Sequence, residues 1–471
     1  MNTERKQSFL TALSILIVNI FVLLGGVVFL KLEPHVPILV NIGIVLCFGI
    51  FCRIPWPELI AGMQKTVADS VGVFLTILMV GVVVGTWTMC GTVPVVIYYG
   101  LLFFSPQWFL ISIMILCFIM AFVTGSSWTT AGTIGVAFMG VGISLGIPVG
   151  LTAGCIISGA MCGDTQSPLG AATNLSAAIS KVDLYETLHS LVYVTIPAIA
   201  GCGIIFTVLG FRYSKITADT SQVREIMDGL AESFHLSPLL ILPIIVLLAL
   251  IFLKIPTVPT LITASLCGVL LSVLCQGNSL GDSLGSMYYG YVSNTGIDLL
   301  DRLLTRGGLM AMASTILLII LALALAGCLE RTRIMSTVIE KISGILQKRF
   351  SVITTSYIMS TVLGFFSADC HMAIVLTSNA LGERFEKLGI HKCVLARTVN
   401  QGATGLSPLV PWTTAGVYFS ATLGAAVTEY VPYYMLAFTM TAATLFFAAT
   451  GLGVRKSAVE APLPVNQREH S

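Results

Sequence analysis

Two aspartates stand among helix-breaking and hydroxyl residues in stretches that are otherwise apolar. Asp164 lies in SGAMCGDTQSPLGAATNLSAAIS, residues 158–180, and Asp369 lies in SADCH, residues 367–371. An ionised carboxylate at bilayer depth costs at least ~2.5 kcal/mol unless a partner compensates its charge. A bound cation is such a partner, so the sequence predicts that both aspartates take part in cation binding.

Hydroxyl and amide side chains lie near both aspartates. They are the oxygen ligands that Na⁺, a hard cation, prefers, together with backbone carbonyls freed where a membrane helix breaks. Besides Asp164 and Asp369, the predicted Na⁺ and proton site contains Ser126, Ser127, Thr129, Ser167, Thr173, Asn174, Thr404, Ser407 and Thr413. His371 is a candidate proton relay, because an unperturbed imidazole titrates near neutral pH.

Each of these residues also has a structural alternative. Asp164 could accept hydrogen bonds from backbone amides of its own loop, and Asp369 could pair with His371. A single hydroxyl could bond to the carbonyls of the helix that carries it. We favour the cation site because the polar residues cluster in two matched pairs of segments.

Glycine and proline interrupt the helices that would position these residues. Backbone groups freed around Gly163, Pro168 and Gly170 are tolerated at membrane depth only inside protein or beside a wet cavity. The same Ser-Pro-Leu pattern recurs at residues 407–409, and each copy follows a second polar interruption. The chain is therefore predicted to be duplicated, with one hairpin and one broken helix in each copy.

The basic residues predict how the two copies are oriented. Residues 139–157 carry no charge, whereas the equivalent residues 383–397 carry four basic side chains. Because basic loops stay in the cytoplasm, these loops are expected on opposite sides, and the repeat is inverted. Residues 351–382 would then form a re-entrant hairpin from the cytoplasm with its tip near Asp369, and residues 107–138 one from outside. Both chain ends are predicted to be cytoplasmic.

The composition is that of a polytopic membrane protein. Hydrophobic residues make up 56% of the 471 residues and charged residues 10%, a balance that no soluble class matches. The predicted fold is all-α, with about ten transmembrane helices, two re-entrant helical hairpins and two broken helices. The expected units are a first inverted repeat, 1–210, a polar linker, 211–236, a second inverted repeat, 237–455, and a polar tail, 456–471.

Several function classes are disfavoured. The net charge of +2 is too small to indicate a nucleic-acid partner. There is no GxxxxGK[ST] phosphate-binding loop, and no enzyme class or cofactor is indicated beyond transported Na⁺ and H⁺. The twelve cysteines lie singly, without a CxxC pair or a metal-binding spacing, and are interpreted as small buried hydrophobic residues.

Five segments carry specific motifs in order along the chain. They are GTWTMCGTVPVVIYYG (85–100), VTGSSWTTAGTIGVAFMG (123–140), SGAMCGDTQSPLGAATNLSAA (158–178), VSNTGIDLLDRLLTRGG (292–308) and GLSPLVPWTTAG (405–416). Together these motifs resemble the NhaC-type sodium/proton antiporter family. The resemblance implies exchange of Na⁺ or Li⁺ for H⁺ in the cell membrane, inverted repeats with paired hairpins, and alternating access by an elevator-like movement.

The chain departs from the family pattern at four positions. Thr165 stands where family members commonly have Lys, Ala171 where they have Asp, and Asn400 and Gln401 where they have an acidic pair. Fewer carboxylates predict weaker Na⁺ affinity and at most two exchanged protons per cycle. They also keep open a Na⁺- or H⁺-coupled exchanger of small organic acids or amines.

The expected partners are small ions, an organic solute in the alternative function, and membrane lipid. A homodimer is one oligomeric state left open. A channel or a receptor is disfavoured, because inverted repeats with broken midplane helices are typical of alternating access.

Overall fold

The structure is a computed structural model that describes residues 8–214, 220–343 and 348–456. Within these residues the chain is helical, with two isolated bridges and no strand. Seven helices are long and apolar enough to cross a membrane, or up to nine if each of two bent pairs counts as one span. The all-α polytopic class is confirmed. Fewer long spans appear than the ten expected, because several crossings are short or broken.

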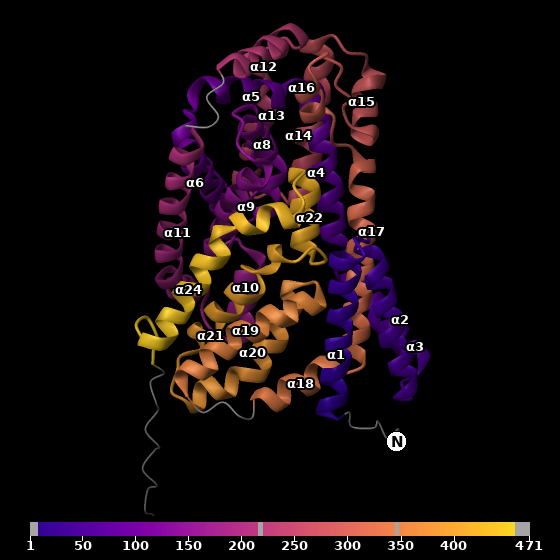
Figure 1. Ribbon diagram of the computed structural model, residues 1–471, viewed down its shortest axis with the longest axis vertical. Helices are drawn as coiled ribbons and strands as arrows, with labels where there is room; N and C mark the ends of the chain where they lie inside the picture. Colours follow the sequence, from indigo (N-terminus) through magenta and orange to yellow (C-terminus); the bar gives the residue numbers. More distant parts are fainter. Residues whose placement is uncertain (1–7, 215–219, 344–347, 457–471) are drawn as a thin grey trace, which may run out of the picture.

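Eleven helices lie within residues 8–214. A π-helical turn, Gly25–Phe29, follows the first of them, and another, Ala131–Gly135, joins the seventh to the eighth. The eleven helices are α1 Phe9–Leu24, α2 His35–Phe51, α3 Trp56–Asp69, α4 Val71–Met89, α5 Thr92–Phe103, α6 Pro106–Thr124, α7 Ser127–Thr130, α8 Val136–Ser144, α9 Val149–Gln166, α10 Ala171–Ser180 and α11 Leu184–Ser214. The helix α12, Thr220–Ser233, lies across one end of the molecule (Figure 1).

Twelve further helices follow α12 in the described part of the chain. They are α13 Leu242–Phe252, α14 Thr257–Gln276, α15 Leu280–Tyr289, α16 Asp298–Leu304, α17 Leu309–Arg331, α18 Ile334–Ser343, α19 Arg349–Ser367, α20 Cys370–Lys387, α21 Lys392–Ala403, α22 Thr414–Leu423, α23 Val427–Tyr430 and α24 Met435–Thr450. Short 3₁₀ turns occur at Pro238–Ile241, Ser407–Leu409 and Val431–Tyr433.

Two sharp turns end long apolar helices beside polar residues. α6 ends at Gly125 with φ +67°, and Ser126 then caps α7 by accepting a hydrogen bond from Thr129 N. α19 ends at Ala368 with φ +54°, and Asp369 caps α20 by accepting one from His371 N. By length and composition α6 and α19, the first arms of the two hairpins, both qualify as spans.

The loops that were expected on opposite sides lie near opposite ends of α24. α24 begins beside α9, where Gly154 packs against Tyr433, and it ends beside α21, where His391 N donates to Arg455 O over 2.9 Å. The turn before α9 and the turn before α21 are therefore separated by the length of α24, which is about 24 Å for its sixteen residues.

Cysteine labelling tests whether these two ends face different compartments. Gly142, in the uncharged segment before α9, is unsuitable for labelling, because it is buried against Thr152. Pro148 and Lys387 are exposed at the two ends. We expect Pro148→Cys to react with an impermeant thiol reagent from outside and Lys387→Cys from the cytoplasm. Cys47 is already exposed in the wild-type protein. The measured quantity is therefore the amount of label that each variant takes up beyond the wild-type amount. Reaction of both variants from one side would contradict the inverted threading.

Candidate functional site

One cavity of about 590 Å³ brings together the two aspartates that the sequence singles out. Asp164 reaches it from the end of α9 and Asp369 from the turn before α20. Of the other predicted residues, the cavity is also lined by Ser126, Ser127, Thr404, Ser407 and His371. The turns of both hairpins and the breaks of both interrupted helices thus meet at one place.

Asp164 is held by the turn of the first hairpin. Ser127 donates two hydrogen bonds to Asp164 Oδ2, from its backbone N over 3.1 Å and from its Oγ over 2.7 Å. Among the described residues no donor contacts Asp164 Oδ1. The donors therefore come from the hairpin and not from the loop that carries Asp164.

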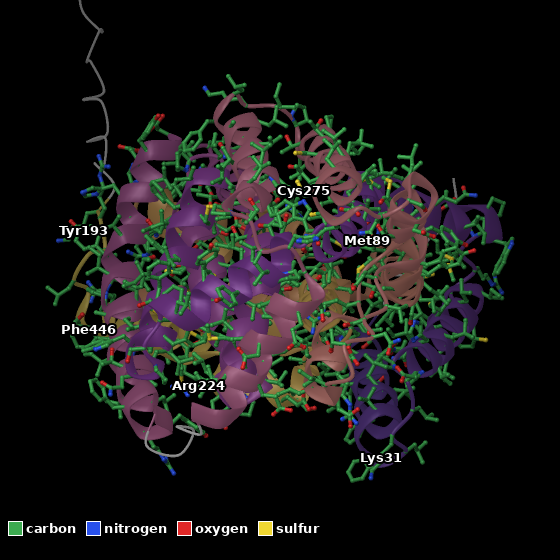
Figure 2. The ribbon with its side chains drawn as sticks, turned by 90° about the horizontal axis from the view of Figure 1, so that it is seen from above. Lys31, Met89, Tyr193, Arg224, Cys275 and Phe446 are labelled. Atoms are coloured by element: carbon green, nitrogen blue, oxygen red, sulfur yellow. The ribbon has the colours of Figure 1, made fainter. Side chains whose placement is uncertain are left out.

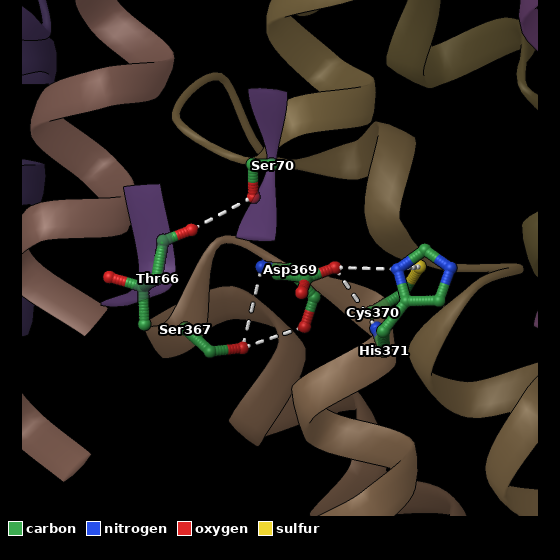
Figure 3. Close-up of polar contacts among 6 residues, drawn as sticks. All are labelled: Thr66, Ser70, Ser367, Asp369, Cys370 and His371. Atoms are coloured by element: carbon green, nitrogen blue, oxygen red, sulfur yellow. Dashed lines mark hydrogen bonds and ion pairs between the residues drawn. The ribbon is translucent and has the colours of Figure 1, made fainter. Parts of the chain in front are cut away.

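Asp369 pairs with His371, which is the structural alternative that the sequence left open for this aspartate. His371 Nδ1 lies 2.9 Å from Asp369 Oδ1, which also accepts a hydrogen bond from His371 N over 3.0 Å. Ser367 Oγ donates to Asp369 O over 2.8 Å and fixes the turn (Figure 3). The imidazole is 44% exposed and lines the cavity, so a proton on His371 can reach both water and Asp369.

Thr404 contributes a hydroxyl that has no partner. Thr404 is 7% exposed and lines the cavity. Its Oγ1 atom is buried and makes no hydrogen bond with any described residue. Buried hydroxyls in folded proteins are normally paired, with protein or with water. Thr404 Oγ1 is therefore an oxygen atom without a partner among the described residues, on a residue that lines the same cavity as the aspartates.

Five predicted residues lie outside the cavity lining and bond to backbone or to neighbours. Thr129 Oγ1 donates to Ser126 Oγ, Ser167 Oγ accepts from Leu169 N, Thr173 Oγ1 donates to Thr165 O, Asn174 Nδ2 donates to the carbonyls of Pro168 and Gly170, and Thr413 Oγ1 donates to Ser407 O. Breaks in a helix free backbone groups, and four of these five side chains satisfy such groups, while Thr129 bonds to the capping Ser126 side chain.

Three charged residues on the cavity were absent from the sequence-based site. Lys65 and Asp69 of α3 and Glu330 of α17 line it from the side opposite the hairpins, and all three are exposed, at its open side. Four carboxylates therefore line the cavity. The expected limit of two protons per cycle assumed only Asp164 and Asp369. Asp69 is the last residue of α3 and Glu330 the second-last of α17, where charges are usually solvated, so neither position indicated a cavity.

The cavity lies between two groups of helices. Thr66 Oγ1 donates to Leu323 O over 2.8 Å, which ties α3 to α17 on one side. Viewed from above, Tyr193 of α11 and Phe446 of α24 stand at one edge of the molecule (Figure 2). Lys31, which follows the π-helical turn Gly25–Phe29, lies at the lower right, and Cys275 and Met89 lie above it in this view.

The four departures from the family pattern occupy different surroundings. Ala171 is exposed and lines the cavity. Asn400 is buried and donates to Thr173 Oγ1 over 2.9 Å, and Gln401 accepts from Thr444 Oγ1 over 3.3 Å. Thr165 Oγ1 donates to Cys162 O over 3.0 Å. Of the four, Ala171 is therefore the position where an added carboxylate would face the cavity.

Known proteins resemble the chain over nearly its whole length. A family profile described as the Na⁺/H⁺ antiporter family matches residues 159–452. The chain is 32% identical over 454 residues to the Na⁺/H⁺ antiporter NhaC of Alkalihalophilus pseudofirmus, covering 96% of this chain and 98% of that protein. The protein belongs to the Na⁺/H⁺ antiporter family.

Other relatives of this antiporter carry names of organic-solute exchangers. It is 30% identical over 451 residues to the malate-2H⁺/Na⁺-lactate antiporter of Bacillus subtilis, with 96% of each chain covered. It is also 30% identical over 438 residues to the arginine/ornithine antiporter ArcD of Halobacterium salinarum, covering 92% of this chain and 90% of that one. Family membership confirms the resemblance to NhaC-type proteins. It also confirms that the protein is a transmembrane antiporter and not an enzyme.

Proposed function

We propose that the protein exchanges Na⁺ or Li⁺ for H⁺, with Asp164 and Asp369 as the groups that bind the ions in turn. The observation that carries this proposal is the shared cavity, which joins two carboxylates from segments far apart in the chain. A protonated carboxyl group carries no charge to hold Na⁺, so occupation by one ion excludes the other. Exclusive occupation of one site is the condition for exchange.

The oxygen atoms around the cavity suit a hard cation. Asp164 Oδ1 and Thr404 Oγ1 are unpartnered among the described residues, and Na⁺ prefers such oxygens. Ser126 and Ser407 lie on the same cavity and extend the ligand set. The proposed roles of Thr129, Ser167, Thr173, Asn174 and Thr413 are indirect, since their side chains hold the turns and helix ends that shape this cavity.

An elevator-like movement and the inverted repeat are part of the proposal. Supporting evidence is the matching order of elements: the long helix α6, the returning α7–α8, the broken pair α9–α10 and the long α11 correspond to α19, α20, α21–α22 and α24. The units 1–210 and 237–455, joined by 211–236, follow this correspondence; the tail 456–471 lies outside the described residues except for Lys456. The position of the cavity between α3, α17 and the hairpins suits sliding of one helix group against another.

The proposed setting is a cell membrane with both chain ends in the cytoplasm. The described chain starts and ends at the same end of the molecule, where α18, α20 and α21 also lie (Figure 1). Glu330, at the end of α17 next to α18, lines the cavity, so the cavity opens toward that end. An inward-open state follows from this orientation.

A second function has its own support. A cavity of about 590 Å³ is far larger than a site for one Na⁺, since a water molecule takes only ~30 Å³. Lys65 adds a cationic group that could hold a carboxylate, beside acidic groups that could hold an amine. The names of two relatives, for malate and lactate and for arginine and ornithine, make organic acids and amines the solutes to test.

Proton flux in proteoliposomes separates the two functions. The purified protein is reconstituted with an internal pH dye, and NaCl, LiCl, KCl, malate, lactate, arginine or ornithine is added outside. We expect Na⁺ and Li⁺ to drive proton movement and K⁺ not to. Flux that requires an organic solute, with no response to NaCl alone, would replace the ion exchanger by the solute exchanger.

Ala171→Asp tests whether the cavity binds Na⁺. The new carboxylate would face the same cavity as Asp164, and we expect it to lower the Na⁺ concentration that gives half-maximal proton flux. Ala171→Asn is the matched control, because it adds a similar volume without the charge. An unchanged half-saturation in a well-folded Ala171→Asp variant would move the preference to the organic-solute exchanger.

A further inference from the structure

Cys370 does not behave as the buried hydrophobic residue that its sequence context suggested. It is partly exposed and lines the cavity, between Asp369 and His371. Its Sγ lies 3.7 Å from His371 Nδ1, and that nitrogen lies 2.9 Å from Asp369 Oδ1. The sulfur, nitrogen and oxygen atoms all lie within 4.8 Å of one another. Three side chains with different donor atoms thus converge on one point.

The local backbone produces this convergence. Ala368 adopts a left-handed conformation, φ +54°, that ends α19, and Asp369 is the cap of α20. Cys370 and His371 then occupy the first turn of α20, so their side chains start close to the capping carboxylate. Figure 3 shows the Cys370 sulfur and the imidazole of His371 on the same side of the turn, next to Asp369. The three side chains therefore come from a single turn, which Thr414 N supports by donating to Ala368 O over 3.0 Å.

We propose that Asp369, Cys370 and His371 form a binding site for one soft divalent transition-metal ion of the Zn²⁺ class. Thiolate, imidazole and carboxylate are the ligands that Zn²⁺ takes in proteins, whereas Na⁺ and Mg²⁺ prefer oxygen alone. Tetrahedral bonds of about 2.0–2.3 Å separate neighbouring ligand atoms by roughly 3–4 Å. The observed separations of 2.9 and 3.7 Å need only small adjustment to reach this range.

Binding has a defined chemistry at this position. The thiol of Cys370 loses its proton to water, and His371 Nδ1 must be unprotonated to bind the metal. The hydrogen bond between His371 Nδ1 and Asp369 Oδ1 is then replaced by bonds to the ion. The fourth coordination position opens to the cavity, since all three residues line it. A bound ion occupies the carboxylate that the proposed Na⁺ exchange requires, so the metal blocks transport.

Direct binding is measured on the full-length protein in detergent, with Co²⁺ as a spectroscopic substitute for Zn²⁺. We expect one Co²⁺ per chain, a thiolate-to-cobalt charge-transfer band, and loss of the band on addition of Zn²⁺. Cys370→Ser should lose the band, while Cys47→Ser, which changes an exposed cysteine outside the cavity, should keep it. Absence of the band, or its persistence in Cys370→Ser, would overturn the metal site.

The block of transport rests on the proposed exchange and is tested separately. Zn²⁺ should inhibit Na⁺-driven proton flux reversibly, with recovery on adding a chelator. For Cys370→Ser the Zn²⁺ concentration for half-inhibition should rise roughly tenfold or more, each variant being compared with its own flux without metal. Equal inhibition of both proteins would overturn the block. A cobalt band in a protein without Na⁺-driven flux would support the metal site and reject the proposed exchange.

Discussion

We expect Asp164→Asn to abolish Na⁺-driven proton movement while the protein still inserts and folds. The amide oxygen of asparagine can accept both hydrogen bonds that Ser127 donates to Asp164 Oδ2, so the contact between hairpin and broken helix is kept. What is lost is the negative charge and the proton-binding group. The measurement is dye-reported proton flux in proteoliposomes after a step in external NaCl, with folding checked by size-exclusion chromatography and helical content.

A matched acidic residue outside the cavity controls for this result. Asp183 accepts a hydrogen bond from Tyr185 N over 2.8 Å at the start of α11, and asparagine can make the same contact. Asp183→Asn should leave the flux unchanged. Flux like that of the wild type in well-folded Asp164→Asn would return Asp164 to a structural role, as an acceptor that joins the hairpin to α9.

Asp369→Asn is expected to have an effect of similar size through the second hairpin. Asparagine is as good a helix cap as aspartate, so α20 should still begin at Cys370. The charge that pairs with His371 and faces the cavity is removed, and with it the proposed second ion-binding group. We expect loss of Na⁺-driven flux at every NaCl concentration, in contrast to a variant with merely weakened affinity, which recovers at high NaCl.

The same helix supplies the comparison for Asp369→Asn. Glu383 lies near the other end of α20, with a side chain that is 82% exposed and 3.4 Å from Lys387 Nζ. An exposed ion pair of this kind contributes little, so Glu383→Gln should keep full flux. If Asp369→Asn restored normal flux at high NaCl, Asp369 would only tune the affinity of a site centred on Asp164.

The sequence by itself determined the class of the protein and the places where its helices break. Low charge and long apolar runs exclude a soluble fold, because only membrane lipid covers so much apolar surface. The turns at Gly125 and at Asp369 were readable because they are local: a glycine ends one helix, and Ser126 and Asp369 cap the next. The family was also predictable from the sequence, because several of its motifs lie at helix breaks, and a relative that covers 96% of the chain confirms it.

Only the tertiary structure decided which polar side chains share the cavity. Ser127 faces Asp164, whereas Thr173 turns to Thr165 O, and both are hydroxyls beside a helix break. A hydroxyl can serve the freed backbone or a ligand equally well, and the choice depends on the direction of its side chain in the packed structure. Glu330 joins the site because α17 packs against α3 across the cavity from the hairpins. Contacts between segments so far apart in the chain leave no periodic or spacing signal in the sequence.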